Sequence, residues 1–232
     1  MQLMLKDDPV LNILENGACQ VLEFDRLPYK VGKHEEAASR LLDLLNIPHI
    51  AYFLSTEEEA AAYLSPERKL WLEGVGERIV KSRLFTNEDI ALVTFEEFCT
   101  FSETYGLNPY WEAKVIDREA YLEMQLADYI LNNDDRHQQN WGFLMENSSG
   151  KLLGYAPLFD HDHAFSDGKN VFSQTTEAES TLEEAAVLAQ QELRLDVTPL
   201  LSMEKPELLE EEKWQAVLAR CRKLQKDARR KR

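Results

Sequence analysis

Two short stretches of this 232-residue chain concentrate the side chains that could do chemistry. The first, over 133–142, has the sequence NDDRHQQNWG, and the second, over 157–163, has the sequence PLFDHDH. A predicted hairpin, with strands over 141–145 and 151–156, separates them. We therefore expect the two polar loops to lie side by side.

The residue types in these loops suit phosphoryl transfer. This reaction needs a carboxylate that positions or deprotonates the acceptor hydroxyl, oxygen ligands for Mg²⁺, and a cation near the phosphates. Asp135 is the candidate carboxylate, and Asn140 and Asp160 are the candidate metal ligands. Their oxygens suit a hard, octahedral cation better than zinc. For Asp134 we favour turn chemistry, because Asp side chains commonly satisfy local backbone groups.

The helix that leads into the first loop has the clearest pattern. Its apolar residues recur at intervals of four, four, three and four, through Ile116, Ala120, Met124, Ala127 and Leu131. This spacing places them on one stripe, and Asp117 is a suitable N-cap. We expect a buried helix that holds the polar loop at its C-terminal end.

The remaining elements change character along the chain. Predicted strands cover 18–24, 49–54 and 77–84. Predicted helices cover 34–46, 116–131, 177–192 and 205–229. The acidic, alanine-rich stretch 55–76 is expected to be an exposed insertion with some helix. These patterns indicate an α+β fold, with a strand-containing part over 1–90 and a mainly helical part over 91–232.

Charge and cysteine usage narrow the class of protein. The chain has 42 acidic and 26 basic residues and a net charge of -16, which disfavours non-specific binding to nucleic acid or anionic lipid. Three cysteines at no metal-ligand spacing argue against a disulfide framework or a zinc finger. Since the chain has neither a long apolar run nor a signal-peptide pattern, we predict a cytoplasmic protein without a membrane span.

The C-terminal end reverses this charge. The stretch from Arg220 to Arg232 has eight basic residues and one acidic residue, a net charge of +7. One interpretation is a helix end, where cations oppose the partial negative charge of the last carbonyls. The other is a docking tail for an acidic partner or nucleic acid.

The two polar loops resemble the catalytic and metal-binding loops of the HipA-like serine/threonine kinases, distant relatives of protein and phosphatidylinositol kinases. Residues 133–140 match the pattern N-x-D-R-H-x-x-N, and residues 157–160 match P-x-[YF]-D. The resemblance covers roughly residues 33 to 165. It implies a two-lobe protein-kinase-like fold of the α+β class, with a shortened N-lobe over 1–90 and a helical C-lobe over 91–232.

The resemblance also implies roles for the matching residues. Asp135 would be the catalytic base, with His137 bracing its loop. Asn140 and Asp160 would bind Mg²⁺. The stretch 81–86 resembles the strand that enters the hinge between the lobes.

A second group of residues is implied to bind ATP. Glu35, on the helix that precedes Ile47-Pro48-His49, would form the ion pair with the ATP lysine. We select Lys30 for this lysine because it lies just upstream of Glu35; a solvated loop lysine is the alternative.

The leading hypothesis is an ATP- and Mg²⁺-dependent serine/threonine kinase that phosphorylates a protein or itself. An antitoxin-like partner belongs to this hypothesis, since some members of the family have one. A pseudokinase is the second hypothesis, because only about 33 residues precede the Glu35 helix and they contain no glycine-rich loop. A metal-dependent phosphohydrolase is the third. Its candidate ligands are His137, Asp160, His161, Asp162 and His163.

Overall fold

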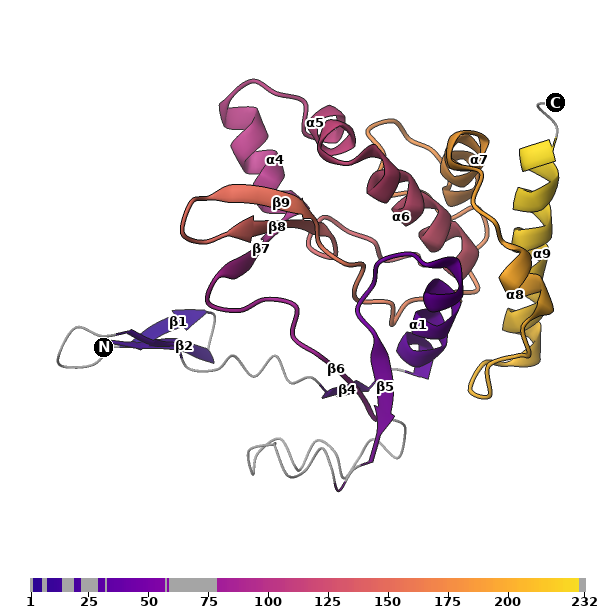
Figure 1. Cartoon of the computed structure of the whole chain (residues 1–232), viewed down its shortest axis with the longest axis horizontal. Coiled ribbons are helices and arrows are strands. Elements are labelled where there is room, and N and C mark those ends of the chain that lie inside the picture. Colours follow the sequence, from indigo (N-terminus) through magenta and orange to yellow (C-terminus); the bar gives the residue numbers. More distant parts are fainter. Residues whose placement is uncertain are drawn as a thin grey trace. The chain divides into compact units, whose positions relative to one another are not determined.

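A computed structural model of the chain describes residues 2–5, 8–13, 19–21, 29–31, 33–56, 58 and 79–229 (Figure 1). The chain divides into two compact units. Met1–Val31 and Leu54–Lys81 form the small unit, and Gly32–Phe53 and Ser82–Arg232 form the large unit. The predicted lobe boundary near residue 90 stays a prediction. Most of the predicted insertion over 55–76 lies outside the described residues.

The first six strands are short and form two three-stranded sheets. Their bounds are β1 (Gln2–Leu5), β2 (Asp8–Ile13), β3 (Cys19–Val21), β4 (Tyr29–Val31), β5 (Tyr52–Ser55) and β6 (Ile79–Ser82). One sheet has the order β1-β2-β3 and the other β4-β6-β5. The predicted strands at 18–24 and 77–84 are confirmed in shorter form as β3 and β6. The strand predicted from His49 begins only at Tyr52, because His49 forms an isolated parallel bridge with Leu158.

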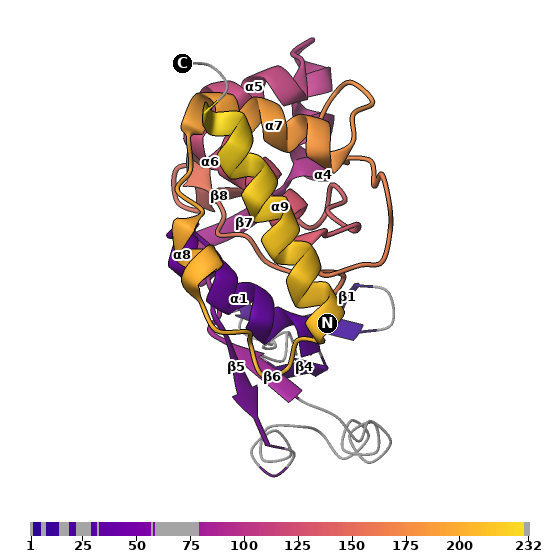
Figure 2. The ribbon, with the colours of Figure 1, turned by 90° about the vertical axis from the view of Figure 1, so that its right-hand side faces the viewer.

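The large unit contains the helices and a third sheet. Its elements are α1 (Lys33–Leu45), β7 (Ile90–Thr94), α4 (Phe95–Thr104), α5 (Pro109–Ile116), α6 (Arg118–Leu131), β8 (Gly142–Glu146), β9 (Lys151–Tyr155), α7 (Leu182–Leu193), α8 (Thr198–Ser202) and α9 (Glu211–Arg229). The central helix is α6, which packs against α5, α7 and α9, while α1 packs against α8 (Figure 2). Among the helices of the described ranges, none combines the length and the apolar character needed to cross a membrane.

The predicted N-cap and burial of α6 are confirmed. The Asp117 carboxylate accepts a hydrogen bond from the Ala120 N–H (3.0 Å), and Met124 and Leu131 are fully buried. Because Asp117 starts a new helix, Ile116 belongs to α5, and the predicted stripe crosses two helices. The helix ends at Asn132, whose left-handed backbone (φ 49°) turns the chain into the first polar loop.

The predicted hairpin is confirmed as β8 and β9, and β7 extends it to a sheet of order β7-β8-β9. The sequence did not indicate β7, because its five residues run directly into α4. Aromatic side chains hold the sheet to α4. Trp141 stacks on Phe95 (3.9 Å between ring centroids), and Phe143 contacts both Phe98 and Tyr155. The residues on either side of the hairpin are therefore fixed by a buried aromatic core.

Two C-terminal helices begin later than predicted. Helix α7 begins at Leu182 rather than near 177, because Thr181 and Glu184 form a capping box that starts the helix there. Helix α9 begins at Glu211 rather than at 205, because the Leu209 N–H bonds the Pro206 carbonyl in a preceding turn. The predicted stripe of α9 is buried. It consists of Trp214, Val217, Leu218, Cys221 and Leu224.

A glycine is required where the first polar loop enters β8. A Cβ atom on Gly142 would lie 2.1 Å from the Val93 carbonyl oxygen, so Gly142→Ala must push β7 and β8 apart. We expect a loss of about 3 kcal/mol in the free energy of unfolding, measured by urea denaturation. Gly106→Ala is the control, because it meets only open space and has a left-handed backbone (φ 68°) that costs about 1–2 kcal/mol. An equal loss in both variants would contradict this account.

A half-buried carboxyl on α6 gives stability a pH dependence. Burial, and then Glu119 and Asp117, raise the pKa of Glu123 from 4.5 to about 7. Because the folded state then holds a proton that the unfolded state releases, stability should fall as pH rises from about 4.5 to 7. Glu123→Gln should remove this part of the profile and be more stable than wild type above pH 7. Thermal unfolding across this range, with exposed Glu207→Gln as control, measures the effect. Parallel profiles for wild type and Glu123→Gln would rule it out.

Candidate functional site

The first polar loop, 133–140, is a series of tight turns between α6 and β8. The His137 N–H bonds the Asp135 carbonyl, and the Asn140 N–H bonds the His137 carbonyl (both 2.9 Å). The Asn140 side-chain amide also donates to the Asp135 carbonyl (2.9 Å). The candidate base and the first candidate metal ligand are thus tied together directly.

The second polar loop, 157–163, lies against the chain that follows α1. The Leu158 N–H bonds the Pro48 carbonyl (2.9 Å), and the Ile50 N–H bonds the Leu158 carbonyl (2.7 Å). Asp160 has a left-handed backbone (φ 59°), a conformation that Asp adopts more readily than most residues. The second candidate metal ligand therefore follows a backbone segment that is hydrogen-bonded to the chain after α1.

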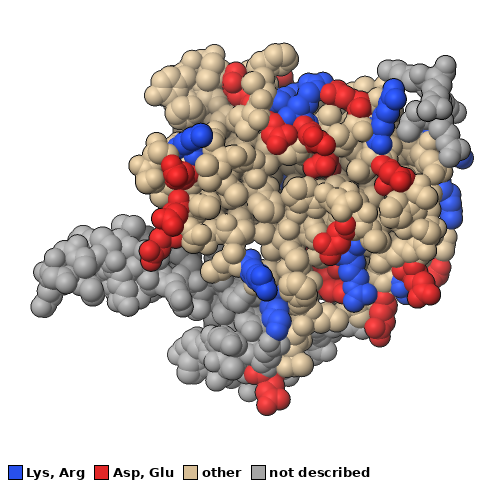
Figure 3. All heavy atoms as spheres, viewed as in Figure 1, with Lys and Arg blue, Asp and Glu red and all other residues tan. Residues whose placement is uncertain are grey.

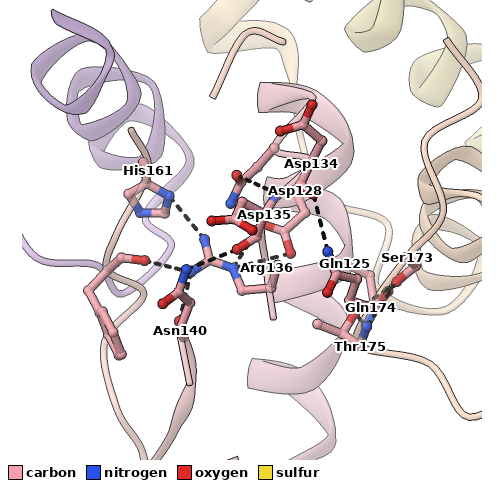
Figure 4. Close-up of polar contacts among 12 residues, drawn as sticks. Gln125, Asp128, Asp134, Asp135, Arg136, Asn140, His161, Ser173, Gln174 and Thr175 are labelled. Carbon is pink, nitrogen blue, oxygen red and sulfur yellow. Dashed lines mark hydrogen bonds and ion pairs between the residues drawn. The ribbon is translucent and has the colours of Figure 1, made fainter. Parts of the chain in front are cut away.

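Arg136 joins the two loops (Figure 4). Its guanidinium donates to the Asn140 carbonyl (2.8 Å) in the first loop and to the Phe159 carbonyl (2.5 Å) in the second. It also donates to the Asp128 carboxylate (3.1 Å) on α6 and bonds Nδ1 of His161 (3.0 Å). The side chains of Arg136 and Asp128 are each only 1% exposed, so these contacts exclude water.

Asp128 is the counter-charge at this junction. Burial raises the pKa of Asp128, while the guanidinium of Arg136 and the amide of Asn133 stabilise its ionised form. Removing two ions from water is costly, and removing one partner of such a pair leaves an uncompensated buried charge. The junction therefore depends on both partners being present.

His161 extends the junction to α1. Since a guanidinium only donates hydrogen bonds, Nδ1 of His161 is the acceptor and the neutral ring holds its proton on Nε2. The His161 backbone N–H donates to the carboxylate of Glu35 (3.0 Å), which is fully buried. The predicted ATP-binding glutamate is thus bound to the residue that follows the second candidate metal ligand.

The structure brings most of the predicted site residues together. Asp135, Asn140 and Glu35 belong to one hydrogen-bonded group around Arg136, and Asp160 lies in the chain between two members of that group, Phe159 and His161. His137 is at the rim, with Nε2 3.9 Å from the Asp135 carboxylate and Nδ1 bonded to the Gln139 N–H.

The structure describes only the backbone of Lys30. Its backbone belongs to β4 of the small unit, and its side chain lies outside the described residues. The pairing predicted between Lys30 and Glu35 therefore stays a prediction.

Asp134 acts at longer range than the predicted turn chemistry. Its carboxylate accepts a hydrogen bond from the Ser166 hydroxyl (2.5 Å) and bonds Nδ1 of His163 (3.1 Å), whose pKa this contact raises. Asn132 adds a side-chain bond to the Ser166 carbonyl (2.7 Å). The carboxylate therefore bonds side chains of the following loop rather than its own backbone, because the chain after His161 passes beside it.

The donor atoms fit a magnesium ion better than zinc. The amide nitrogen of Asn140 is engaged with the Asp135 carbonyl, which leaves the side-chain oxygen as the ligand atom, and Asp160 adds a carboxylate. Mg²⁺ commonly takes one or two protein carboxylates, with waters and substrate phosphates filling its other positions. In the described ranges, no group of three or more His, Cys, Asp or Glu side chains has the arrangement of a metal site.

Asp128 and His161 were not predicted as members of this junction. Asp128 lies beside Met124, Ala127 and Leu131 on the buried side of α6, and a carboxylate there is a signal of a buried partner. The sequence contains this signal, but it does not identify Arg136 as the partner. For His161 the sequence suggests only a role as a metal ligand.

This chain is similar to known proteins in its three-dimensional structure. No family model matches the sequence, and no curated protein matches it. Among solved structures, the proinflammatory kinase CtkA of Helicobacter pylori has a TM-score of 0.58 and 14% identity, over 86% of each chain. HipA of Shewanella oneidensis MR-1, solved with HipB and operator DNA, has a TM-score of 0.46 and 13% identity, over 89% of this chain and 58% of its own.

The similarity to CtkA shows an α+β kinase-like fold, which is the class that the sequence predicted. At the level of the fold, this agrees with the kinase-like part of the resemblance that the two polar loops indicated, and the HipA-like family stays a prediction.

The buried ion pair gives a stability prediction. Asp128→Asn leaves the Arg136 guanidinium buried without its counter-charge, and we expect a loss of about 3–5 kcal/mol in the free energy of unfolding. Glu192→Gln is the matched control, because it breaks the bidentate pair with Arg118 on the exposed surface. That pair is screened by solvent, so its loss should be much smaller. Urea unfolding of both variants makes the comparison, and equal losses would contradict a buried junction.

Proposed function

We propose that this chain is an ATP- and Mg²⁺-dependent phosphotransferase, a serine/threonine protein kinase of the HipA-like type. The observation that supports this most is the position of Arg136, which bonds the loop of Asp135 and Asn140 and the loop of Asp160 at once. Phosphoryl transfer depends on holding a base and metal ligands in one fixed arrangement.

Each residue then has a defined task. The half-exposed carboxylate of Asp135 accepts the proton of the acceptor hydroxyl. Asn140 and Asp160 would hold Mg²⁺ through their side-chain oxygens. When bound, this ion neutralises charge on the phosphate oxygens. His137 braces the loop from its rim.

Glu35 and Lys30 complete the proposed nucleotide site. Glu35 orients the lysine ammonium that contacts the phosphates, and its bond to the His161 N–H aligns α1 with the second loop. Lys30 is the proposed lysine. The acceptor is a serine or threonine of a protein, in another chain or in this one. An antitoxin-like or acidic partner is proposed for the basic stretch that begins at Arg220.

Two alternatives differ in support. A pseudokinase is supported by residues 1–32, before α1 starts at Lys33, because Gly17 and Gly32 are isolated there and form no glycine-rich loop. ATP binding without transfer would identify it. A phosphohydrolase is disfavoured, because the ring of His161 bonds Arg136 and the ring of His163 bonds Asp134, so neither Nδ1 is available for a metal.

Substitution of the two aspartates tests the assignment. Asp135→Asn removes the base and Asp160→Asn a metal ligand, and we expect each to lower γ-phosphate transfer from labelled ATP at least about 100-fold. The matched control is Asp167→Asn, an exposed aspartate of the same loop region, which should keep wild-type transfer. Circular dichroism checks that all three variants are folded. Transfer retained in either folded site variant would refute the kinase assignment.

A further inference from the structure

Helices α4 and α5 carry a group of large apolar side chains that are exposed among the described residues. Five large exposed residues occur within fifteen positions, on the two helices and the turn between them. They are Phe101, Tyr105, Leu107, Trp111 and Val115. We call this cluster the α4–α5 face. All but Leu107 are more than half exposed. Single exposed apolar residues are common on protein surfaces, but groups of them are uncommon.

The helix geometry explains why α4 leaves side chains outside the core. Phe95, Phe98 and Ser102 are buried and define the inner side of the helix. Phe101 and Tyr105 are four residues apart on another side, with ring centroids 4.8 Å from each other. Their exposure therefore does not result from a lack of core, because α4 already has a buried face.

Helix α5 repeats this arrangement beside α4, against which it packs. Ala113 faces the core, while Trp111 and Val115 are four residues apart and exposed. The two exposed pairs share the same helical spacing. Figure 3 shows a largely uncharged area over α4 on the face in view.

The charges around this face are negative. Between Phe95 and Ile116 the chain has four glutamates and one lysine, and that lysine, Lys114, lies over the ring of Tyr121. Glu103 and Glu112 form no ion pair with any residue of the described ranges. Burial, and then Glu103 and Glu96, raise the pKa of Cys99, as expected in a negative field.

We propose that the α4–α5 face docks an amphipathic helix of a partner protein, with an apolar stripe and flanking lysines or arginines. The apolar pairs at four-residue spacing match the stripe of such a helix. Glu103 and Glu112 supply complementary charge to the basic flank. A second copy of this chain fits less well, because the acidic face would meet another acidic face and each chain has a net charge of -16.

The test uses a fluorescently labelled synthetic helix of about 18 leucine and lysine residues, with leucine on one stripe, and a twin with glutamate in place of lysine. We expect micromolar binding of the lysine helix by anisotropy, and about tenfold weaker binding for Phe101→Ser and for Trp111→Ser. Phe172→Ser is the matched control: Phe172 is 62% exposed and Trp111 64%, but Phe172 lies outside α4 and α5. Its affinity should equal that of wild type.

Charge reversal separates docking from general adhesion. Glu103→Lys with Glu112→Lys should weaken binding of the lysine helix and create binding of the glutamate helix. The proposal fails if Phe172→Ser loses as much affinity as Trp111→Ser, or if the two peptides bind wild type equally. It also fails if sedimentation shows a dimer of wild type that Trp111→Ser dissociates, since a second copy then covers the face. Circular dichroism confirms that each variant is folded.

Discussion

The buried contact between Arg136 and Asp128 is the constraint on which the site depends. A guanidinium without water must satisfy its donors inside the protein, and here they reach α6, both polar loops and the ring of His161. Moving any of these elements would leave a charge or a donor unpaired in the interior. Because Arg136 is buried, its hydrogen bonds hold the two polar loops in one fixed arrangement.

The surrounding fold supports this junction from the other side of the first loop. The Phe95 N–H bonds the Trp141 carbonyl and the Glu96 N–H bonds the Gln138 carbonyl, so the start of α4 rests on the loop. The close approach of Gly142 to β7 then sets the start of the hairpin. The same helix that supports the loop presents the α4–α5 face on its outer side, so the two features share one rigid element.

Sequence patterns indicate the parts of the candidate site that are local in the chain. Asp135, Asn140 and Asp160 lie in short motifs that can be recognised in the sequence without knowledge of the fold. The N-cap at Asp117 follows from its residue type alone. The partners of Arg136 could not be predicted, because Asp128 and His161 lie 8 and 25 residues away and meet only after packing. Strand β7 was missed because its pairing with β8 determines it more than its own five residues do. Helix α7 starts at a capping box, and helix α9 starts after a turn. Neither feature can be predicted from the spacing of hydrophobic residues.

The central claim is that the group around Arg136 is a working phosphoryl-transfer site, and one measurement on the wild-type chain tests it most directly. ATP binding and transfer of the labelled γ-phosphate are followed in the same preparation, with and without Mg²⁺. The account predicts that ATP binds and that label appears on a serine or threonine of a protein, this chain included, only when Mg²⁺ is present. Binding of ATP without any transfer to protein, with Mg²⁺ present, would contradict it.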